Sequence, residues 1–335
     1  MILYYKKTEV IIMIWSLYVP LGYNMWFTEY DKLIFEDKAW KIIVDKAVEN
    51  GFNQIVLDLG EGVQYSSHPE LAVMGAWTRE RVRDEVKALH ERGIELIPKL
   101  NFSATHHLWL RDYRRMLGLP KYYEVCRDLI REVYELFDKP RFIHLAMDEE
   151  GDPQFFSKME LVAFRQGELL WHDLRFLCDC VSNLGSKPWI WGDIPFIFPD
   201  EFFKRFKPGS VMISPWNYRG LKEEHYTIIA GSIYEKTYEG TGYKYVEEDP
   251  LCVRYMERSV PTAEAGFDIV PCASICFGCM YNPDDVVEYF EQNAPRDHMA
   301  GYMIAPWVPT TMEKIDEIVK NIEMLKAVRD KFYKE

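Results

Sequence analysis

The chain has 335 residues, and its 53 acidic and 40 basic side chains give a formal charge of -13 at pH 7. This excess of negative charge argues against nucleic acid or an anionic membrane as the main partner and favours a neutral or cationic small ligand. Aromatic residues make up 15% of the chain, with ten Trp and 21 Tyr, and such flat side chains serve both large cores and sugar-binding clefts.

The cysteines and the N-terminus indicate where the protein works. Seven cysteines are an odd number without the density of a disulfide scaffold, so we expect a reducing compartment, the cytoplasm. The apolar residues 10–15 follow Lys6 and Lys7 as in a signal peptide, but Glu9 interrupts the approach and no small-residue cleavage site follows. No stretch reaches the roughly 18 uncharged apolar residues of a membrane span. A homo-oligomer stays open.

The hydrophobic pattern repeats a strand followed by a helix along the chain. Gly51 and Gly93 follow the first two helical patterns, as is common at helix C-termini. The predicted strands cover residues 10–19, 54–59, 94–102, 141–152, 188–194, 210–218, 268–276 and 299–308, and the fourth of them ends in acid. The predicted helices cover residues 35–50, 78–92, 121–137, 155–183, 250–265, 283–293 and 311–331.

Eight such units predict an α/β fold, a (β/α)8 TIM barrel that forms a single domain over residues 1–335. Each crossover is long enough for parallel pairing of the strands. No glycine-rich phosphate loop or change in composition marks a second domain, and the alternative is a doubly wound open sheet. The connection 219–247, rich in Tyr, Gly and Glu, is either a functional loop over one end of the barrel or a surface excursion.

Polar and aromatic side chains gather at the predicted C-terminal ends of the strands, where the active sites of such barrels lie. A cluster drawn from several strands is stronger evidence for a site than any single motif. The residues at this rim are Asp58, Glu61, Lys99, Asn101, His106, Asp148, Glu149, Trp191, Asp193, Trp216, Tyr218 and Trp307.

Asp148 and Glu149 are the strongest candidates for chemistry. They end an apolar strand, and charges in such a place are costly unless they are paired or used. Neighbours on a strand point to opposite faces, so both acids reach the site only if the chain turns at Asp148, which Gly151 favours. Alternatively, Asp148 caps the next helix or pairs with Lys99, and Glu149 is a solvated loop residue.

The residues around this pair resemble the family 20 glycoside hydrolases, the β-N-acetylhexosaminidases. The run His144-Leu-Ala-Met-Asp-Glu149 is similar to the His-x-Gly-Gly-Asp-Glu signature at the end of that family's fourth strand, and it is the most specific element. Residues 97–101 resemble the third-strand Ile-Pro-Glu-Ile-Asp, with His106 one position later than the family's following histidine. Residues 188–193 resemble the Trp-bearing fifth strand, while Trp216 and Trp307 fall where members build the wall of the sugar pocket.

The resemblance implies retaining hydrolysis of a β-linked amino sugar from the non-reducing end, with the sugar's own acetamido oxygen attacking the anomeric carbon. Asp148 would orient and charge the acetamido group, and Glu149 would be the general acid and then the base. His144 and His106 would tune that proton, and the remaining rim residues would bind the carbohydrate. We expect no cofactor and no metal.

Four departures mark a divergent relative. The family's Gly-Gly is Ala146-Met147 here, and its strand-three acids are Lys99 and Asn101. Its strand-one arginine has no counterpart in residues 16–22, and the sequence shows no counterpart of the non-catalytic domain that usually precedes the barrel. Lys99 in the site would favour an anionic sugar or lower the pKa of a nearby acid.

Other functions stay open at this point. Another glycoside could be cleaved by two carboxylates, and a non-catalytic carbohydrate-binding barrel would bind without turnover. A metal-dependent barrel such as a sugar isomerase is a further alternative, although no compact ligand motif supports it. Its candidate ligands are His106, His144, Asp148, Glu149 and Asp193.

Three cysteines have the spacing of an iron–sulfur cluster motif. Cys272, Cys276 and Cys279 match the motif of radical enzymes that use S-adenosylmethionine. That motif normally follows the first strand of a barrel, whereas these residues follow the seventh. We therefore expect small buried residues of that strand.

Overall fold

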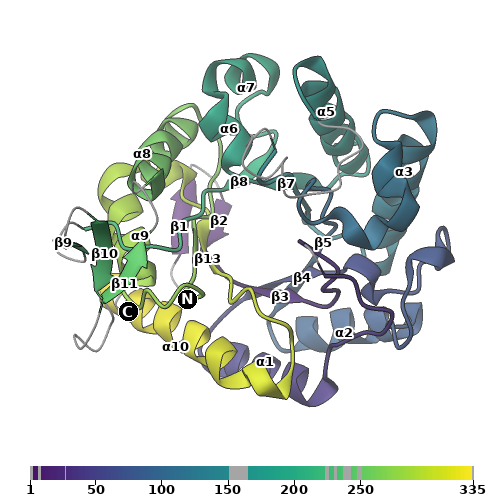
Figure 1. The fold of residues 1–335 in the computed structure, drawn as a ribbon, viewed down its shortest axis with the longest axis horizontal. Helices are drawn as coiled ribbons and strands as arrows, with labels where there is room; N and C mark the ends of the chain where they lie inside the picture. The colour runs from purple at the N-terminus through teal and green to yellow at the C-terminus, as the bar shows by residue number, and fades with distance from the viewer. Residues whose placement is uncertain are drawn as a thin grey trace.

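The computed structural model describes residues 3–6, 9–26, 28–150, 165–222, 226–229, 232–236, 243–246 and 251–333. Its centre is a ring of eight parallel strands enclosed by helices (Figure 1). The strands are β3 Ile14–Pro20, β4 Gln54–Asp58, β5 Glu95–Lys99, β6 Phe142–Ala146, β7 Lys187–Trp191, β8 Met212–Ser214, β12 Cys272–Ala273 and β13 Gly301–Ile304. Around the ring they follow the order β12, β13, β3, β4, β5, β6, β7 and β8.

Backbone hydrogen bonds bring the two ends of this strand order together. Val270 N donates to Ile213 O at 2.8 Å, and Cys272 N donates to Pro215 O at 2.7 Å. The barrel is therefore nearly closed. This confirms the predicted (β/α)8 fold, and the alternative of a doubly wound open sheet is wrong.

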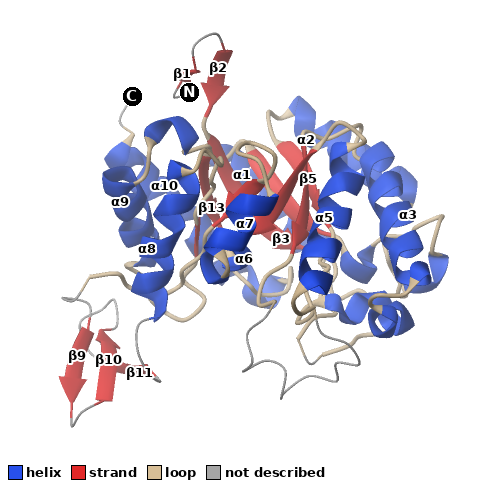
Figure 2. Ribbon diagram, turned by 90° about the horizontal axis from the view of Figure 1, so that it is seen from above, coloured by secondary structure: helices blue, strands red, loops and turns tan. Residues whose placement is uncertain are grey.

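Amphipathic helices cover the outside of the ring (Figure 2). The third of them begins at Pro120, where no backbone N–H is needed, and buries Tyr122, Val125 and Leu129 at helical spacing. None of the described helices is long and apolar enough to cross a membrane. The helices are α1 Asp37–Glu49, α2 Arg79–Glu91, α3 Pro120–Leu136, α5 Glu168–Ser182, α6 Asp193–Ile197, α7 Pro199–Arg205, α8 Leu251–Glu264, α9 Asn282–Asn293 and α10 Ile315–Phe332.

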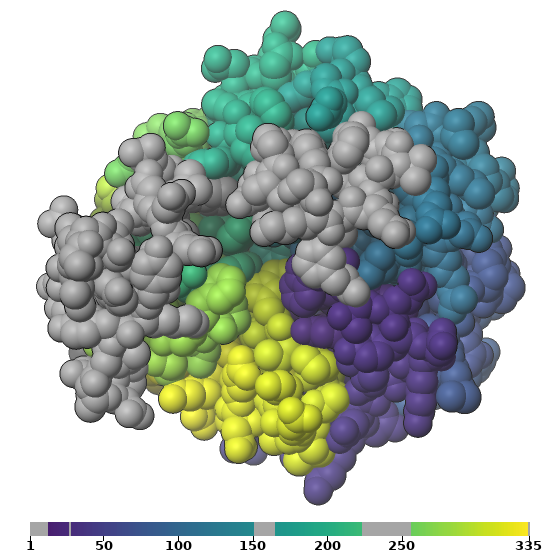
Figure 3. Space-filling model, viewed as in Figure 1, coloured from purple at the N-terminus to yellow at the C-terminus, as the bar shows by residue number. Residues whose placement is uncertain are grey.

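The first and last units of the chain close the ring. β13 pairs with β3, with Gly301 opposite Ile14, and α10 packs against α1. Figure 3 shows the result on the surface, where the yellow C-terminal residues lie beside the purple N-terminal ones. The barrel is thus built from both ends of the sequence.

Two buried apolar clusters lie on the two sides of the strands. The smaller cluster takes alternate residues of a strand, such as Ile14 and Tyr18 of β3 or Trp189 and Trp191 of β7, and it fills the barrel. The larger cluster takes the intervening residues, such as Leu17, and packs beneath the helices.

The first predicted strand, residues 10–19, is divided between two elements. β2 (Glu9–Ile12) pairs antiparallel with β1 (Leu3–Lys6), and the barrel strand begins only at Ile14. Figure 2 shows this hairpin beyond the end of the barrel at which β3 begins. The apolar run is continuous across both elements, so its pattern could not indicate the boundary.

Several other boundaries differ from the prediction, and the strands predicted over 94–102, 141–152 and 299–308 are also shorter in the structure. β8 and β12 are much shorter than residues 210–218 and 268–276, because Pro215 and Pro271 have no N–H to donate to a neighbouring strand. The fifth strand ends at Trp191, since α6 begins two residues later. Of the helix predicted over 155–183, the part up to residue 164 lies outside the described residues.

The connection 219–247 contains a small antiparallel sheet. Its strands are β9 (Tyr226–Ile229), β10 (Ser232–Lys236) and β11 (Tyr243–Val246), with β10 in the middle. Figures 1 and 2 place the sheet at the edge of the ring, toward the end opposite to the hairpin β1–β2. Its functional role stays a prediction.

Candidate functional site

The C-terminal end of β6 has an irregular backbone, and both acids follow it. The pairing of β6 with β7 shifts register between His144 and Ala146. Ala146 and Met147 then take φ angles of 63° and 62°, in the left-handed region that side chains disfavour. His144 Nδ1 accepts a hydrogen bond from Ala146 N at 3.0 Å, which holds the bend. The chain therefore turns before Asp148, not at it as predicted.

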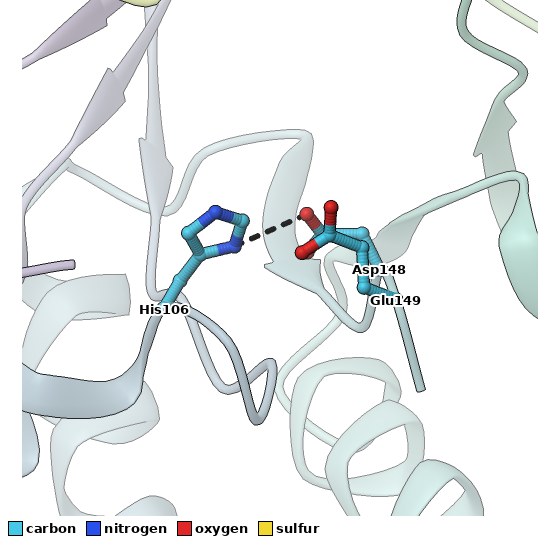
Figure 4. A group of neighbouring side chains, drawn as sticks. All are labelled: His106, Asp148 and Glu149. Carbon is cyan, nitrogen blue, oxygen red and sulfur yellow. Dashed lines mark ion pairs between the residues drawn. The ribbon is translucent and has the colours of Figure 1, made fainter. Parts of the chain in front are cut away.

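Asp148 is buried and is held by the loop that follows β5. Its backbone N donates to Ser103 Oγ at 3.1 Å, and the Ser103 hydroxyl donates to one carboxylate oxygen. His106 Nδ1 lies 3.1 Å from the other carboxylate oxygen (Figure 4). Burial alone would raise the pKa of Asp148, but His106, Lys99 and Ser103 outweigh it and hold the pKa below its usual range. Asp148 is therefore an anion at neutral pH.

Glu149 is less buried than Asp148 and takes a φ of 57°. Its backbone N donates to Asp193 Oδ1 at 3.1 Å, at the start of α6. The other oxygen of Asp193 accepts a hydrogen bond from Trp216 Nε1 at 2.8 Å. Burial and the nearby Asp148 raise the pKa of Asp193 to about 7. Asp193 thus connects the backbone of Glu149 to the Trp216 ring.

His106 belongs with the two acids. Its ring stacks on Trp307, with the planes 11° apart and the centroids 6.2 Å apart. Burial by itself lowers the pKa of His106, but Asp148 reverses the effect and the net pKa is raised. Asp148 therefore favours the protonated form of the His106 ring, and the two side chains form a buried pair.

His144 lies inside the barrel instead. Its ring centroid is 5.2 Å from that of Trp189 and 4.8 Å from that of Trp191. Burial, reinforced by Lys99, lowers the pKa of His144 far below its ordinary value, so the ring is neutral. Its observed contact is with the backbone of β6, and a direct role with the proton of Glu149 stays a prediction.

Asp58 and Lys99 satisfy one another inside the barrel. The parallel register sets them opposite each other on β4 and β5, and the Lys99 ammonium contacts the Asp58 carboxylate with both groups buried. The Tyr18 hydroxyl donates to the same carboxylate at 3.0 Å, and the Asn101 amide lies at 3.5 Å. The positive charge of Lys99 is therefore already balanced.

Glu61 is buried beside a small cavity of its own. Its Oε1 accepts hydrogen bonds from Tyr23 N at 2.7 Å and Asn24 N at 3.1 Å, and burial raises its pKa to about 7. The cavity measures about 10 Å³, enough for about one water, and Asp58 and Asn101 also line it. The structure does not bring Asp58, Glu61, Lys99 or Asn101 to the wall of the main cavity, and their contact with substrate stays a prediction.

The main cavity measures about 490 Å³ and has a largely aromatic wall. The predicted residues that line it are His106, Asp148, Glu149, Trp191, Trp216, Tyr218 and Trp307. Five further lining residues were not predicted to lie in a carbohydrate site, namely Trp26, Cys276, Phe277, Val308 and Glu317. Four of the five lie at or after the C-terminal ends of the first, seventh and eighth predicted strands, so a search along these ends could have found them. Glu317 lies on α10 and had no local signal.

Among the residues that the structure describes, the group that could hold a metal ion consists of His106, Asp148 and Glu149. One potential ligand atom from each of His106, Asp148 and Glu149 lies within 4.8 Å of the other two. His144 and Asp193, which the metal hypothesis included, do not belong to that group. Nδ1 of His106 already pairs with Asp148, so a cation would have to compete for it.

The three cysteines do not belong to the group of described residues whose ligand atoms lie close enough together to hold a metal ion. Cys272 and Cys279 are buried, as expected, while Cys276 is half-buried on the wall of the main cavity. Burial raises the pKa of Cys276 to about 11, so this thiol is protonated at neutral pH.

Comparison with known proteins identifies solved structures that share this fold. No family model and no curated protein matches the sequence. The structure, however, matches a β-N-acetylhexosaminidase from Bacteroides fragilis, with a TM-score of 0.62 and 15% identity over 93% of this chain and 65% of that one. The chain shares the barrel fold of the family 20 glycoside hydrolases.

Two structures of family 20 enzymes are similar to this chain to the same degree. An exo-β-N-acetylglucosaminidase from Vibrio harveyi has a TM-score of 0.59 and 14% identity over 93% of this chain and 54% of that one. A β-N-acetylhexosaminidase from Streptomyces coelicolor has a TM-score of 0.59 and 11% identity over 93% of this chain and 63% of that one. The chain thus spans 54–65% of the length of these three proteins.

Proposed function

We propose that this protein is a glycoside hydrolase that removes a β-linked amino sugar from the non-reducing end of its substrate, with retention at the anomeric carbon. The observation that carries the proposal is the pair Asp148 and Glu149 on the wall of an aromatic cavity of about 490 Å³. A cavity of this size suits one sugar ring with part of its leaving group, and aromatic walls suit the apolar faces of such rings.

Asp148 has the properties of the residue that orients an acetamido group. Its lowered pKa keeps it anionic, and Ser103 and His106 fix its direction. An anionic oxygen can accept a hydrogen bond from the acetamido N–H and balance the positive charge that the group acquires. The acetamido oxygen is then the nucleophile, so the enzyme itself forms no covalent bond to the sugar.

Glu149 would supply and then recover the proton. In the first step the Glu149 carboxyl protonates the glycosidic oxygen while the bond from C1 to that oxygen breaks and the acetamido oxygen bonds to C1. In the second step the Glu149 carboxylate takes a proton from water, the water oxygen bonds to C1, and the acetamido group is released. Two successive displacements at C1 retain its configuration.

One observation favours a second candidate, hydrolysis by two carboxylates. One oxygen of Asp148 and one of Glu149 lie within 4.8 Å of each other, nearer than the roughly 6.5–9.5 Å between the carboxyl groups of inverting enzymes, so the pair suits a retaining mechanism with a carboxylate nucleophile. Such an enzyme would hydrolyse sugars that lack an acetamido group. The choice of substrate therefore distinguishes the two mechanisms.

The first experiment is to assay nitrophenyl glycosides with the wild type, Asp148→Asn and Glu149→Gln. We expect turnover of β-N-acetylglucosaminide or β-N-acetylgalactosaminide and a loss of at least about 100-fold in kcat/KM for each variant. Asp285→Asn is the matched control, because Asp285 is a buried carboxyl that accepts a hydrogen bond from Leu221 N and does not line the cavity.

The same assay separates the competing functions. Turnover of another glycoside, with both N-acetyl sugars inert, would replace the acetamido nucleophile by a carboxylate. Activity that a chelator abolishes and a divalent cation restores would favour the metal-dependent barrel. Binding without turnover across a broad glycoside panel would indicate a carbohydrate-binding protein, and full activity of Glu149→Gln would exclude its role as the acid.

A further inference from the structure

A fully buried arginine lies directly behind the two acids. The Arg165 guanidinium donates from Nη1 to Glu150 Oε1 at 2.6 Å and to the Phe102 backbone oxygen at 2.9 Å. Its Nε donates to Asp173 at 3.0 Å, and its Nη2 donates to the Tyr122 hydroxyl at 2.6 Å. All three nitrogens of the guanidinium are therefore engaged.

Glu150 completes a clamp between two loops. The same Oε1 that binds Arg165 accepts a hydrogen bond from Ala104 N at 2.8 Å. Phe102 and Ala104 belong to the loop after β5, and Glu150 directly follows the two acids after β6. Arg165 and Glu150 thus fasten the second loop to the first on both sides of Ser103.

The contacts alternate along the two loops. Ser103 binds the backbone and the carboxylate of Asp148, while its neighbours bind Glu150 or Arg165. Glu149 is therefore flanked by two anchored residues, Asp148 and Glu150. This side chain lines the cavity instead of joining the clamp.

We propose that Glu150 and Arg165 are positioning residues, whose function is to hold Asp148 and Glu149 in the geometry that the reaction needs. The proposal rests on the proposed function for the meaning of that geometry. A buried ion pair is a poor source of stability, because desolvation offsets its attraction, but it fixes the groups it joins. Positioning matters because a shift of about 1 Å in a reacting group can reduce the rate about 100-fold.

The test compares Glu150→Ala with a control on the far side of the same arginine. Tyr122→Phe removes one acceptor of Arg165 but leaves the contacts of Arg165 with Phe102 and Glu150 in place. We expect Glu150→Ala to lower kcat at least about 30-fold with KM changed less than about threefold. Tyr122→Phe should keep kcat within about twofold, and the conservative Glu150→Gln should recover most of the activity, because it keeps an acceptor for Ala104 N.

A second readout does not depend on hydrolysis. The raised pKa of His106 depends on Asp148, so an NMR titration of the His106 ring reports where Asp148 lies. We expect its pKa to fall in Glu150→Ala and to stay unchanged in Tyr122→Phe. If Glu150→Ala does not fold, Arg165→Lys takes its place, since it keeps the buried charge but cannot span the same partners.

The outcomes separate this proposal from the proposed function. A fall in the His106 pKa without any glycoside turnover by the wild type would support the clamp and reject the proposed function. Wild-type turnover with kcat unchanged in Glu150→Ala would overturn the clamp alone. An equal loss of kcat in Tyr122→Phe and Glu150→Ala would also overturn it, because the arginine would then act only through general stability.

Discussion

Buried carboxyl groups in this protein differ in charge because their partners differ. Asp148 has a cationic neighbour and a hydroxyl donor, so it stays ionised in spite of its burial. Asp193 and Glu61 are also buried but have mainly neutral donors, and the pKa of each is raised to about 7. Of these three acids, only the anionic Asp148 lines the main cavity.

The raised pKa of Glu61 predicts a pH-dependent cost to stability. Folded Glu61 keeps its proton up to about pH 7, whereas unfolded Glu61 loses its proton near pH 4.5. The stability that protonated Glu61 contributes to the folded state is therefore fully present below pH 4.5 and is lost as pH rises through 7. Glu61→Gln keeps the acceptor for Tyr23 N and Asn24 N and has no charge to lose. Relative to the wild type, we expect the variant to gain up to about 3 kcal/mol of unfolding free energy between pH 5 and pH 8.

Urea unfolding of both proteins at pH 5 and pH 8 measures this difference. Taking the change between the two pH values cancels the contributions of all groups that titrate alike in both proteins. An equal stability difference at pH 5 and pH 8 would contradict the prediction.

At the scale of elements, the turn after β6 decides where the acids lie. The bulge and the positive φ angles of Ala146 and Met147 end the alternation of the strand before Asp148. The Gly-Gly of the family 20 motif would adopt such angles without strain. This chain keeps the bend although neither residue is glycine, and the bond from Ala146 N to His144 stabilises it.

Because of this bend, we expect Ala146→Gly to destabilise the protein less than an alanine-to-glycine substitution in a buried helix. Removing the Ala146 methyl loses buried contact but relieves roughly 1–2 kcal/mol of left-handed strain. Ala47→Gly, in the buried face of α1, loses a similar methyl and adds about 1 kcal/mol of helix cost. We expect Ala146→Gly to lower the unfolding free energy at least about 1 kcal/mol less than Ala47→Gly in urea titrations. Equal losses would show that the angle at residue 146 costs nothing.

At the scale of the whole molecule, negative charge surrounds the cavity. The chain carries a net charge of -13, and Asp148, Glu149 and Glu317 line the cavity. The cation that sequence reasoning placed in the site, Lys99, is buried against Asp58 and does not line the cavity. The expectation that it favours an anionic sugar therefore finds no support in the geometry.

This distribution predicts discrimination against acidic sugars. Like charges brought together in a binding site cost several kcal/mol, so a nitrophenyl β-glucuronide should be cleaved at least about 100-fold more slowly than the preferred neutral glycoside. Measuring kcat/KM for both at low and high salt checks the cause, since salt should narrow the gap. A glucuronide that is cleaved as well as the neutral sugar would contradict the prediction.

Most of the fold could be predicted from the sequence, because repeated strands and helices bury apolar faces at regular spacing. The eight units and the rim of polar strand ends follow from that periodicity, and the motif at 144–149 indicated the fold family. The extent of one domain over residues 1–335 stays a prediction. Local pattern failed where an apolar run continued through two elements, as at residues 10–19, and where Pro215 and Pro271 shortened strands.

The sequence by itself determined the barrel, because the strand–helix pattern repeats along the chain, and it placed Asp148 and Glu149 after the end of the fourth strand. Only the tertiary structure decided which rim residues share a cavity, because strand register pairs Asp58 with Lys99 and leaves Asp148 to His106. The tertiary structure also decided that Glu317 lines the cavity and that Arg165 binds the loop after β5. Both residues lie far along the chain from the segments they meet. Such contacts have no local signal, because they depend on distances that the chain sets only when the barrel closes.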